Sequence, residues 1–480
     1  MSDSRKRASW SGQLAFVLAA AASAIGLGNL WRFPYLAAQY GGGTFIVVYL
    51  CLVVTLGFTL MLSEIASGRK TQQSQLTAYS RLHRGWGFIG LLGTVVPLLI
   101  VPYYCVIGGW VLKYFVTYCQ MAFCGAAPMG EAAAQSKEFF GAFISSNFAP
   151  FGYGSLFILA CAVVIVMGVK NGIERSNLVL MPALFTLAIV ISIYVICLPG
   201  TGDGLRYYLV PSMDALCDSA GSFSFAQLGK TILGAMGQMF YSLSLAMGIM
   251  ITYGSYMRKG DSIEKCVRRI EVFDTLIAVI AGLMIIPVVY MFAVKTGTPV
   301  KEAMNAGPGL MFITLPKVFA TLGAAGAWVG LAFFLLVIFA ALTSAISLYE
   351  ACVASVCDLL HLDRRSATTF TGAIILFLAT FSALGYGPWA DVTVCGQQFL
   401  DFFDFITNSV LMPIVAAATC IFIGWVLKPK AIVDEVEAEG NPFRAKTLYR
   451  FMVKYFAPLF VLAILVSEVF RYFGWYGWKI

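Results

Sequence analysis

The sequence predicts an all-α polytopic membrane protein, and three observations lead to this class. Of the 480 residues, 60% are hydrophobic and only 12% are charged, whereas about 25% charged residues is usual in soluble domains. The mean hydropathy is +0.83. Eleven apolar runs follow one another along the chain. We therefore expect one membrane domain with eleven transmembrane helices rather than several soluble domains.

The apolar runs give the expected limits of these helices. They cover residues 13–38, 43–68, 88–123, 155–170, 178–198, 230–256, 265–295, 326–358, 367–385, 399–427 and 451–473. Each approaches or exceeds the roughly 20 residues that a helix needs to cross a bilayer, except the fourth, which is short.

The Lys and Arg residues indicate the orientation. With a cytoplasmic N-terminus, most of the 32 basic residues fall in cytoplasmic segments, as the positive-inside rule requires. An odd number of spans then places the C-terminus outside. The formal net charge of +8 follows from this asymmetry, so it indicates no nucleic-acid partner. The first run is too long and too interrupted for a cleaved signal peptide, so we expect it in the mature chain.

Cysteine and histidine argue against catalysis or metal chemistry in the membrane. The twelve cysteines are scattered through the runs without CxxC spacing, which is typical of small buried hydrophobic residues. The two histidines, His83 and His361, fall in predicted cytoplasmic loops. A nucleophile inside a span would therefore have no histidine as its base. We expect that the protein is not an enzyme.

The first span contains a break. Residues 21–34 read AASAIGLGNLWRFP and carry Gly26, Gly28, Asn29 and Arg32. The glycines weaken the helix, and unwound backbone in hydrocarbon is tolerated only where it lines a polar cavity. The alternative is a glycine-rich packing face with Arg32 reaching the interface, but this does not explain Asn29 together with Arg32.

The sixth span has a second break. Residues 238–250 read QMFYSLSLAMGIM, with hydroxyls, an amide and a glycine at mid-span. Because five spans separate the two breaks, two similar units would have opposite topology, which is the pattern of an inverted repeat with a binding site at the bilayer midplane. The N-terminal ends of half-helices there attract a carboxylate, and the C-terminal ends, with their free carbonyls, coordinate a cation. The residues thus predict a cation-coupled transporter of a small anionic or zwitterionic solute.

Five motifs resemble the neurotransmitter:sodium symporters, in their bacterial, leucine-transporter-like amino-acid branch. They are AIGLGNLWRFPY with GGGTF, PYYCVIGGW, GQMFYSLSLAMG, AALTSAIS and FLDFFDF, and the resemblance covers most of residues 7–427. It implies ten core helices arranged as a five-plus-five inverted repeat, Na+-driven uptake and two sodium sites. The chain then divides into a cytoplasmic N-terminal gate segment (1–12), the transporter core (13–427), and a cytoplasmic loop with the eleventh helix (428–480).

The resemblance also implies ligands for sodium, all of them hard oxygen donors. The first site would use the Ala24 carbonyl, Asn29, Ser242 and Asp274, together with the substrate carboxylate. The second would use the carbonyls of Ala22, Ile25 and Ala340 and the hydroxyls of Thr343 and Ser344. From the residues alone, the last two hydroxyls are instead expected to bond back to their own helix.

The substrate implied is a neutral α-amino acid. Gly26 occupies the position where monoamine-type members carry an aspartate for the amine, so the substrate is expected to bring its own carboxylate. Tyr104 would reach that carboxylate. The other substrate-binding residues would be Ala24, Ile100, Tyr241, Ser242, Ser244, Met247, Ser344 and Leu348. Their mostly apolar character favours a hydrophobic or aromatic side chain, although Met247 and Tyr241 could simply be packing residues.

Two positions depart from the family pattern. Asp274 stands where many members have asparagine, and it would supply the charge that chloride-dependent relatives obtain from a bound anion, so chloride should not be required. If its helix begins near Ser262, Asp274 lies about 18 Å along it; the alternative is that it merely marks the membrane entry. Ala246 replaces a glycine of several relatives, and its methyl should restrict the largest substrates.

Paired charges are expected to form gates. Arg32 and Asp404 would form the outer gate above an aromatic lid of Tyr104 and Tyr241, and structural ion pairing is the alternative for the first pair. By resemblance, the inner gate would consist of Arg7, Trp10, Tyr256 and Asp358. Such pairs must break in every cycle, so each should contribute only about 1 kcal/mol.

Other functions fit the sequence less well. A channel would need ringed selectivity elements along a pore, and an amino-acid sensor built on a transporter fold would usually carry a sizeable soluble output region. The predicted outer loops contain no Asn-x-Ser/Thr sequon, which favours a prokaryotic plasma (inner) membrane. Beyond the amino acid, Na+ and the lipid bilayer, the sequence indicates no obligate protein partner.

Overall fold

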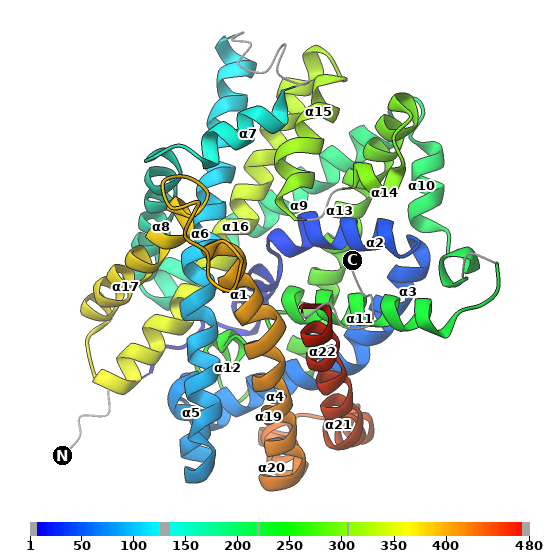
Figure 1. Cartoon of the computed structure of the whole chain (residues 1–480). Helices are drawn as coiled ribbons and strands as arrows, with labels where there is room; N and C mark the ends of the chain where they lie inside the picture. Colours follow the sequence, from blue (N-terminus) through cyan, green and yellow to red (C-terminus); the bar gives the residue numbers. More distant parts are fainter. Residues whose placement is uncertain (1–6, 125–134, 218–220, 305–306, 473–480) are drawn as a thin grey trace.

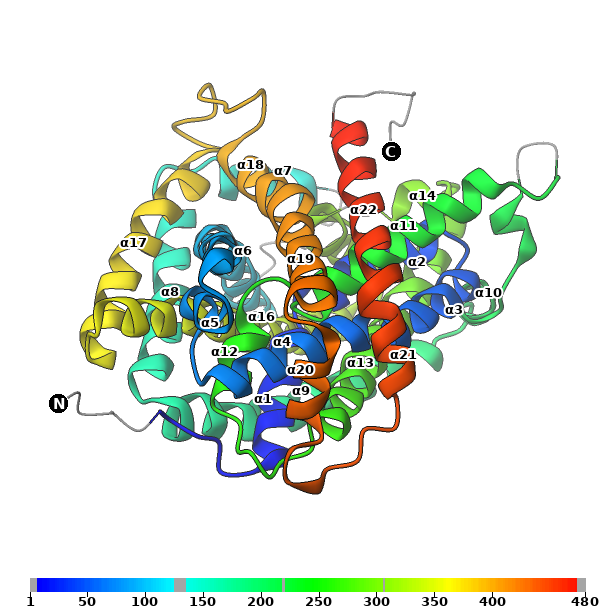
Figure 2. The ribbon, with the colours of Figure 1, turned by 90° about the horizontal axis from the view of Figure 1, so that it is seen from below.

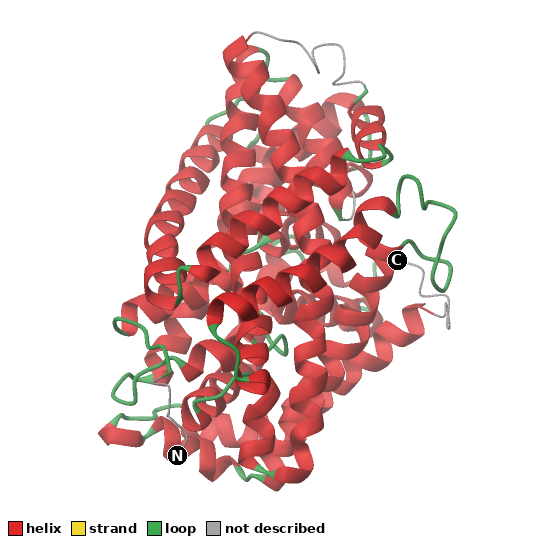
Figure 3. Ribbon diagram, turned by 90° about the vertical axis from the view of Figure 1, so that its left-hand side faces the viewer, coloured by secondary structure: helices red, strands yellow, loops and turns green. Residues whose placement is uncertain are grey.

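The computed structural model describes residues 7–124, 135–217, 221–304 and 307–472. Within these residues the chain is helical, and only isolated β-bridges occur (Figure 3). Residues 1–6 of the predicted gate segment and residues 473–480, at the end of the predicted C-terminal segment 428–480, lie outside this part. The structure thus has the all-α class that the composition predicts.

Nine helices of the described part are long and apolar enough to cross a bilayer. They are Gly43–Thr71 (α3, η2 and α4), Arg84–Cys124 (η3 and α6), Ala149–Val166 (α8), Val169–Ile196 (η4 and α9), Ile263–Thr296 (α13), Ala324–Leu360 (α16), Arg364–Leu384 (α17), Phe399–Val426 (α18, η7, α19 and η8) and Lys446–Phe470 (α21, η10 and most of α22). Each corresponds to a predicted run, and the shortest, α8, is the fourth run of the sequence.

Two further predicted spans are broken in the structure. The first consists of α1 (Gln13–Ala24), followed by η1 (Gly28–Arg32) and α2 (Phe33–Gln39), with a bend of 54° between the halves. Counted as one span, this pair brings the helices that could cross the membrane to ten in the described part. The sixth predicted run corresponds to α11 (Phe225–Ser242) and α12 (Ile249–Ser255), separated by non-helical residues 243–248.

Several spans contain π-helical turns, in which one extra residue enters the helix. These turns are η1, η2 (Val53–Gly57), η4 (Val169–Glu174), η7 (Phe405–Leu411), η8 (Phe422–Val426) and η10 (Met452–Phe456). In such a turn a carbonyl loses its usual helical partner. At η2 the Val54 carbonyl accepts a hydrogen bond of 3.2 Å from Arg268 Nη1.

The long helices α6 (Gly87–Cys124) and α16 pack against each other, and α16 also packs on α1 and α12 of the broken spans (Figures 1 and 2). α13 packs on α1 and α9 (Arg175–Ile196), and α12 packs on α4 (Phe58–Thr71). This places both breaks inside the bundle, where unwound backbone can find partners.

Short helices cap the two ends of the bundle (Figure 1). One end carries the described N-terminus with α5 (Gln75–Leu82) and α20 (Pro429–Val436). The opposite end carries α7 (Ser136–Ile144), α14 (Val300–Ala303) and α15 (Leu315–Ala320). α10 (Gly202–Leu209) packs on α13.

Candidate functional site

The first broken span unwinds at the glycines that the sequence singles out. α1 ends at Ala24, Ile25 is extended (φ −78°, ψ 98°), and the chain resumes as a helix in η1. A Cβ atom on Gly26 would lie 2.6 Å from Ser344 Oγ and 2.9 Å from the Tyr104 hydroxyl. Both distances are shorter than a normal van der Waals contact, so a side chain at this position would displace the hydroxyls of Ser344 on α16 and Tyr104 on α6.

The second break is held open by a buried carboxylate. Ser244, Ala246 and Gly248 have φ values of 53°, 58° and 73°, which end the regular helix. The Ala246 N–H has no helical acceptor and donates to Glu64 Oε1 at 2.8 Å. Glu64 belongs to α4 and is only 4% exposed. The side chain therefore replaces the carbonyl that a continuous helix would supply.

The two breaks lie side by side between α6 and α16. Ser244 Oγ donates to the Ser23 carbonyl at 3.1 Å, and Ser344 Oγ lies 3.0 Å from the same carbonyl and 3.2 Å from that of Ile25. The Leu27 N–H donates to the Tyr104 hydroxyl at 3.2 Å. The groups freed by unwinding are thus bonded to hydroxyls from three other elements.

A buried acidic cluster adjoins this junction. Asn29 Nδ2 donates to Asp274 Oδ1 at 2.8 Å and to Ser242 Oγ at 3.0 Å. Ser242 Oγ donates to Asp274 Oδ1 at 2.8 Å, and the Tyr49 hydroxyl donates to Asp274 Oδ2 at 3.2 Å. Asp274 is fully buried and forms no ion pair with a described Lys or Arg. An uncompensated carboxylate among oxygen donors suits a hard cation.

Asp274 is deep in its helix, as the sequence argument requires. α13 begins at Ile263, and Asp274 is 0% exposed. Its side chain is thus enclosed by the helix bundle, eleven residues after the helix begins.

The hydroxyls predicted for the second sodium site behave differently from each other. Thr343 Oγ1 donates back within α16, to the carbonyls of Phe339 at 3.0 Å and Ala340 at 3.1 Å. Ser344 instead bonds across to the broken end of α1. Ala22 and Ala340 are both buried, on helices α1 and α16 that pack together.

A small cavity lies where these elements meet. It has a volume of about 20 Å³, which is room for about one water molecule. No charged side chain lines it. The lining residues include every predicted substrate-binding residue except Ser242: Ser23, Ala24, Gly26, Gly28, Asn29, Ile100, Tyr104, Tyr241, Ser244, Met247, Ile249, Ser344 and Leu348. A larger molecule could enter only if the surrounding helices moved apart.

The predicted outer pair is not in direct contact. Asp404 Oδ1 accepts hydrogen bonds from the Tyr103 hydroxyl at 3.1 Å and from Asn408 Nδ2 at 2.6 Å. The guanidinium of Arg32 lies over the Tyr241 ring, 5.7 Å from its centroid. Arg32 and Asp404 form no ion pair within 4 Å, and Arg32 instead contacts Tyr241, which lines the cavity.

The predicted inner-gate residues are in direct contact at the opposite end. Arg7 Nη1 lies 2.7 and 2.9 Å from the two oxygens of Asp358, and its guanidinium is 5.1 Å from the centroid of Tyr256. Trp10 Nε1 donates to the Tyr253 carbonyl at 3.1 Å. The side chains of Arg7 and Asp358 are 16% and 13% exposed, so the pair retains some access to water.

Two buried glutamates of the site are not among the predicted residues. Glu64 holds the second break, as described above. Glu350 Oε1, on α16, accepts a hydrogen bond of 2.8 Å from the Tyr256 hydroxyl. Its other oxygen, Oε2, forms an ion pair of 2.6 Å with Arg364 Nη2. Both stand alone inside apolar runs. An ionisable residue in a span is by itself a signal of function, and this signal could have found them.

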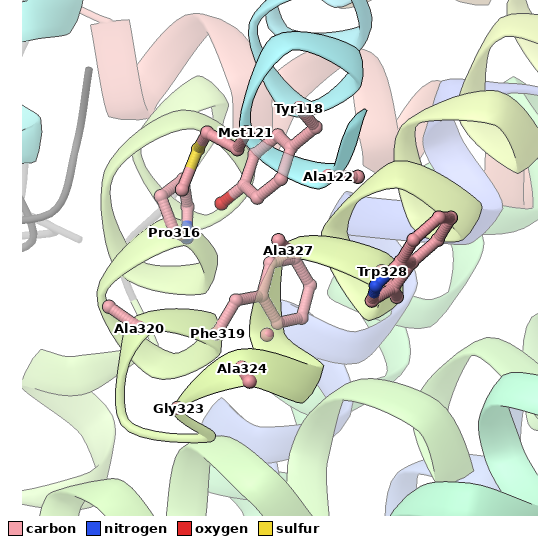
Figure 4. A pocket seen from close by; sticks show the side chains of 11 residues that line it. Tyr118, Met121, Ala122, Pro316, Phe319, Ala320, Gly323, Ala324, Ala327 and Trp328 are labelled. Carbon is pink, nitrogen blue, oxygen red and sulfur yellow. The ribbon is translucent and has the colours of Figure 1, made fainter. Parts of the chain in front are cut away.

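Another hollow lies away from these residues, at the end of the bundle opposite the N-terminus. It has a volume of about 320 Å³, and Figure 4 shows side chains of α6, α15 and α16 around it, among them Tyr118, Phe319 and Trp328. None of the residues lining it is charged or belongs to the predicted site.

Comparison with known proteins agrees with this arrangement. The Sodium:neurotransmitter symporter family matches residues 7–132 and 153–477. A sodium-dependent transporter of Haemophilus influenzae is 31% identical over 98% of this chain and 99% of its own. The sodium-dependent transporter YhdH of Bacillus subtilis is 30% identical over 97% and 98% of the two chains.

A solved structure extends the similarity to the fold. The crystal structure of MhsT in complex with L-phenylalanine has a TM-score of 0.82 and 35% sequence identity, over 96% of this chain and 100% of MhsT. The chain is thus a multi-pass membrane transporter and not an enzyme, and it belongs to the Sodium:neurotransmitter symporter family of sodium-dependent transporters.

Proposed function

We propose that this symporter imports neutral, hydrophobic or aromatic L-amino acids together with Na+ by alternating access. The observation that carries the proposal is the cavity between the two broken spans, which has no charged lining side chain. A charged substrate side chain would be buried there without a partner, at a cost of several kcal/mol. The similarity to MhsT, whose structure contains L-phenylalanine, supports the same substrate class.

The ends of the amino acid would meet the unwound backbone. Its carboxylate would approach the Tyr104 hydroxyl and the beginning of η1, where the helix dipole is positive. Its ammonium group would face the carbonyls at the end of α1. Ile100, Tyr241, Met247 and Leu348 would then surround the side chain. The cavity is too small for this at present, so binding has to be accompanied by outward movement of these elements.

Two Na+ ions would be transported with the substrate. The first would be held by the Ala24 carbonyl, Asn29, Ser242, Asp274 and the substrate carboxylate. The buried charge of Asp274 supports this assignment, and it would make chloride unnecessary. The second would be held by Thr343, Ser344 and the carbonyls of Ala22, Ile25 and Ala340. The contact of Ser344 with the Ile25 carbonyl supports a site between α1 and α16.

Alternating access would exploit the two gates. Breaking the pair of Arg7 and Asp358 would open the inner end, and displacing Arg32 and Tyr241 would open the outer end. We propose eleven spans, with the first ten as an inverted repeat whose broken helices are the first and the sixth. The N-terminus would lie in the cytoplasm of a prokaryotic cell, with the C-terminus outside the inner membrane.

Uptake by proteoliposomes tests this function. Radiolabelled L-phenylalanine and L-leucine should accumulate when an inward Na+ gradient is imposed, and not when choline replaces external Na+. Accumulation in sodium gluconate should equal that in sodium chloride. Lysine and glutamate in tenfold excess should compete poorly. Na+-dependent binding without accumulation would instead indicate a sensor, and strong competition by lysine would exclude a neutral pocket.

A further inference from the structure

A basic hollow opens between the last two spans, at the end of the molecule that carries the N-terminus. It has a volume of about 460 Å³. It is lined by Lys428, Pro429, Lys430, Thr447, Arg450, Phe451, Lys454 and Tyr455. In Figure 1 this is the lower region where α20 and α21 lie, and in Figure 2 α19 and α22 run side by side beside it. The transport site uses none of these residues.

The four cations of this hollow lack acidic partners. No ion pair joins Lys428, Lys430, Arg450 or Lys454 to a described acidic side chain. Two of the nearby acids are engaged elsewhere, because Glu435 of α20 binds Arg69 and Glu437, just after α20, binds Lys446. Asp434 of α20 is exposed and forms no ion pair with a described Lys or Arg. Four like charges repel one another around the hollow, so an anion placed between them would be stabilised.

Aromatic rings are part of the same hollow. Lys454 Nζ lies 5.0 Å from the centroid of Trp425 and 5.2 Å from that of Tyr455, and the Trp425 indole N–H donates to the Lys454 carbonyl at 3.2 Å. Trp425, Phe451 and Tyr455 are 56%, 51% and 50% exposed. Exposed Trp and Tyr beside basic residues are typical of the level of the lipid headgroups.

An apolar stripe continues from the hollow along α22 (Ala457–Tyr472). Leu459, Leu462 and Val466 are 65%, 43% and 49% exposed. Together with Tyr455 they recur at intervals of four, three and four residues, so they lie on one face of the helix. In a bilayer this face contacts acyl chains. A molecule with a phosphate in the basic hollow would therefore have a hydrocarbon surface for its chains directly beside it.

We propose that this hollow binds one anionic phospholipid of the adjacent leaflet. Its phosphate would lie among Lys428, Lys430, Arg450 and Lys454, and its acyl chains would lie along Leu459, Leu462 and Val466. A basic pocket between membrane helices is a known form of anionic-headgroup recognition. The combination of unpaired cations with an adjoining lipid face favours a lipid over a soluble phosphate, which would use only the cations. With the proposed orientation, the lipid belongs to the cytoplasmic leaflet.

Native mass spectrometry of the full-length protein in detergent tests this site. The probes are phosphatidylglycerol, phosphatidylcholine and soluble glycerol 3-phosphate. Phosphatidylglycerol should bind at one high-affinity site per chain, and phosphatidylcholine should bind at least tenfold more weakly. The double variant Arg450→Gln with Lys454→Gln should lower phosphatidylglycerol affinity about 25-fold, because each basic residue near a membrane surface contributes about fivefold.

A matched variant distinguishes this pocket from general attraction to basic residues. Arg81→Gln with Arg84→Gln removes the same charge from two exposed positions, one in α5 and one just after it, at the same end of the molecule. Its phosphatidylglycerol affinity should stay within about twofold of the unmodified chain. Lys428→Gln with Lys430→Gln provides a second pocket variant if the first does not fold.

Three results would overturn the proposal. The first is an equal loss of affinity in the Arg81 and Arg84 variant. The second is equal binding of phosphatidylcholine. The third is displacement of phosphatidylglycerol by millimolar glycerol 3-phosphate, which would assign the hollow to a soluble phosphate. All of these readouts are independent of transport, so failure of the proposed substrate class would not affect them.

Discussion

Glu64 Oε1 accepts a hydrogen bond of 2.8 Å from the backbone N–H of Ala246, and this bond joins the middle of α4 to the break between α11 and α12. The second oxygen of Glu64 is buried and has no hydrogen-bond partner. The backbone N–H of Ala246 in the unwound segment thus depends on one acceptor from another helix. The distance between α4 and the break therefore helps to set the position of residues 243–248, two of which, Ser244 and Met247, line the cavity.

Replacing Glu64 should show how far the break depends on this acceptor. Glu64→Leu leaves the Ala246 N–H buried without a partner, at a cost of about 1 to 3 kcal/mol. Glu64→Gln keeps a carbonyl acceptor at the same place and should cost much less. Thermal unfolding in detergent measures the stability of both variants, and an Na+-dependent amino-acid binding assay measures whether their sites still form. If Glu64→Gln lost as much stability and binding as Glu64→Leu, the charge of Glu64 rather than its hydrogen-bond acceptor would be what matters.

Asp274→Asn should abolish Na+-driven uptake in chloride-free buffer at neutral pH. The substitution retains the shape of the side chain but removes the buried negative charge next to Asn29 and Ser242. Added chloride should restore part of the activity by supplying that charge. Uptake in gluconate and chloride buffers is the measurement. Chloride-dependent transport by the unmodified chain, or normal transport by the variant without chloride, would contradict the assignment.

Na+ and the amino acid should strengthen each other's binding by the same factor, because the substrate carboxylate is proposed to complete the first sodium site. A coupling free energy of about 1 to 3 kcal/mol corresponds to roughly 5- to 150-fold. Calorimetric titration of leucine at several Na+ concentrations measures the effect of Na+ on leucine affinity. Titration of Na+ with and without leucine measures the effect of leucine on Na+ affinity. Leucine affinity that is unchanged when choline replaces Na+ would reject the shared site.

Gly26→Ala should abolish substrate binding. The added Cβ would lie 2.6 Å from Ser344 Oγ and 2.9 Å from the Tyr104 hydroxyl, so it would displace two groups of the proposed site. Gly12→Ala is the matched control, because a Cβ there has no heavy atom within 4 Å. A scintillation proximity assay with labelled leucine compares them. Retained binding in Gly26→Ala would show that this close approach is unnecessary for recognition.

Ala246→Gly should shift the preference towards tryptophan. Ala246 has a φ of 58°, where a Cβ costs about 1 to 2 kcal/mol, so glycine would let the turn beside Met247 open more easily. One methyl group in a tight pocket discriminates by about 1 to 3 kcal/mol. Competition assays with leucine, methionine, phenylalanine, tyrosine and tryptophan give the relative affinities, including the ratio of tryptophan to leucine affinity. An unchanged ratio of tryptophan to leucine affinity would remove Ala246 from the explanation of substrate size.

The sequence determined the fold class because hydropathy and the length of apolar runs are local properties. A segment of about 20 apolar residues must form a helix in hydrocarbon whatever surrounds it. The break in the first span was equally local, since Gly26 and Gly28 stand in one short segment with Asn29 and Arg32. The break in the sixth predicted run was indicated in the same way, by polar residues at its middle.

Tertiary structure decided which groups meet across the bundle. Glu64 and Ala246 are 182 positions apart, and no local pattern indicates that one accepts a hydrogen bond from the other. The same holds for Ser344, which bonds to α1, while the adjacent Thr343 bonds within its own helix. Direction around a helix changes by about 100° per residue, so two neighbouring hydroxyls face different partners. That choice depends on how α16 packs against α1, which the sequence alone does not specify.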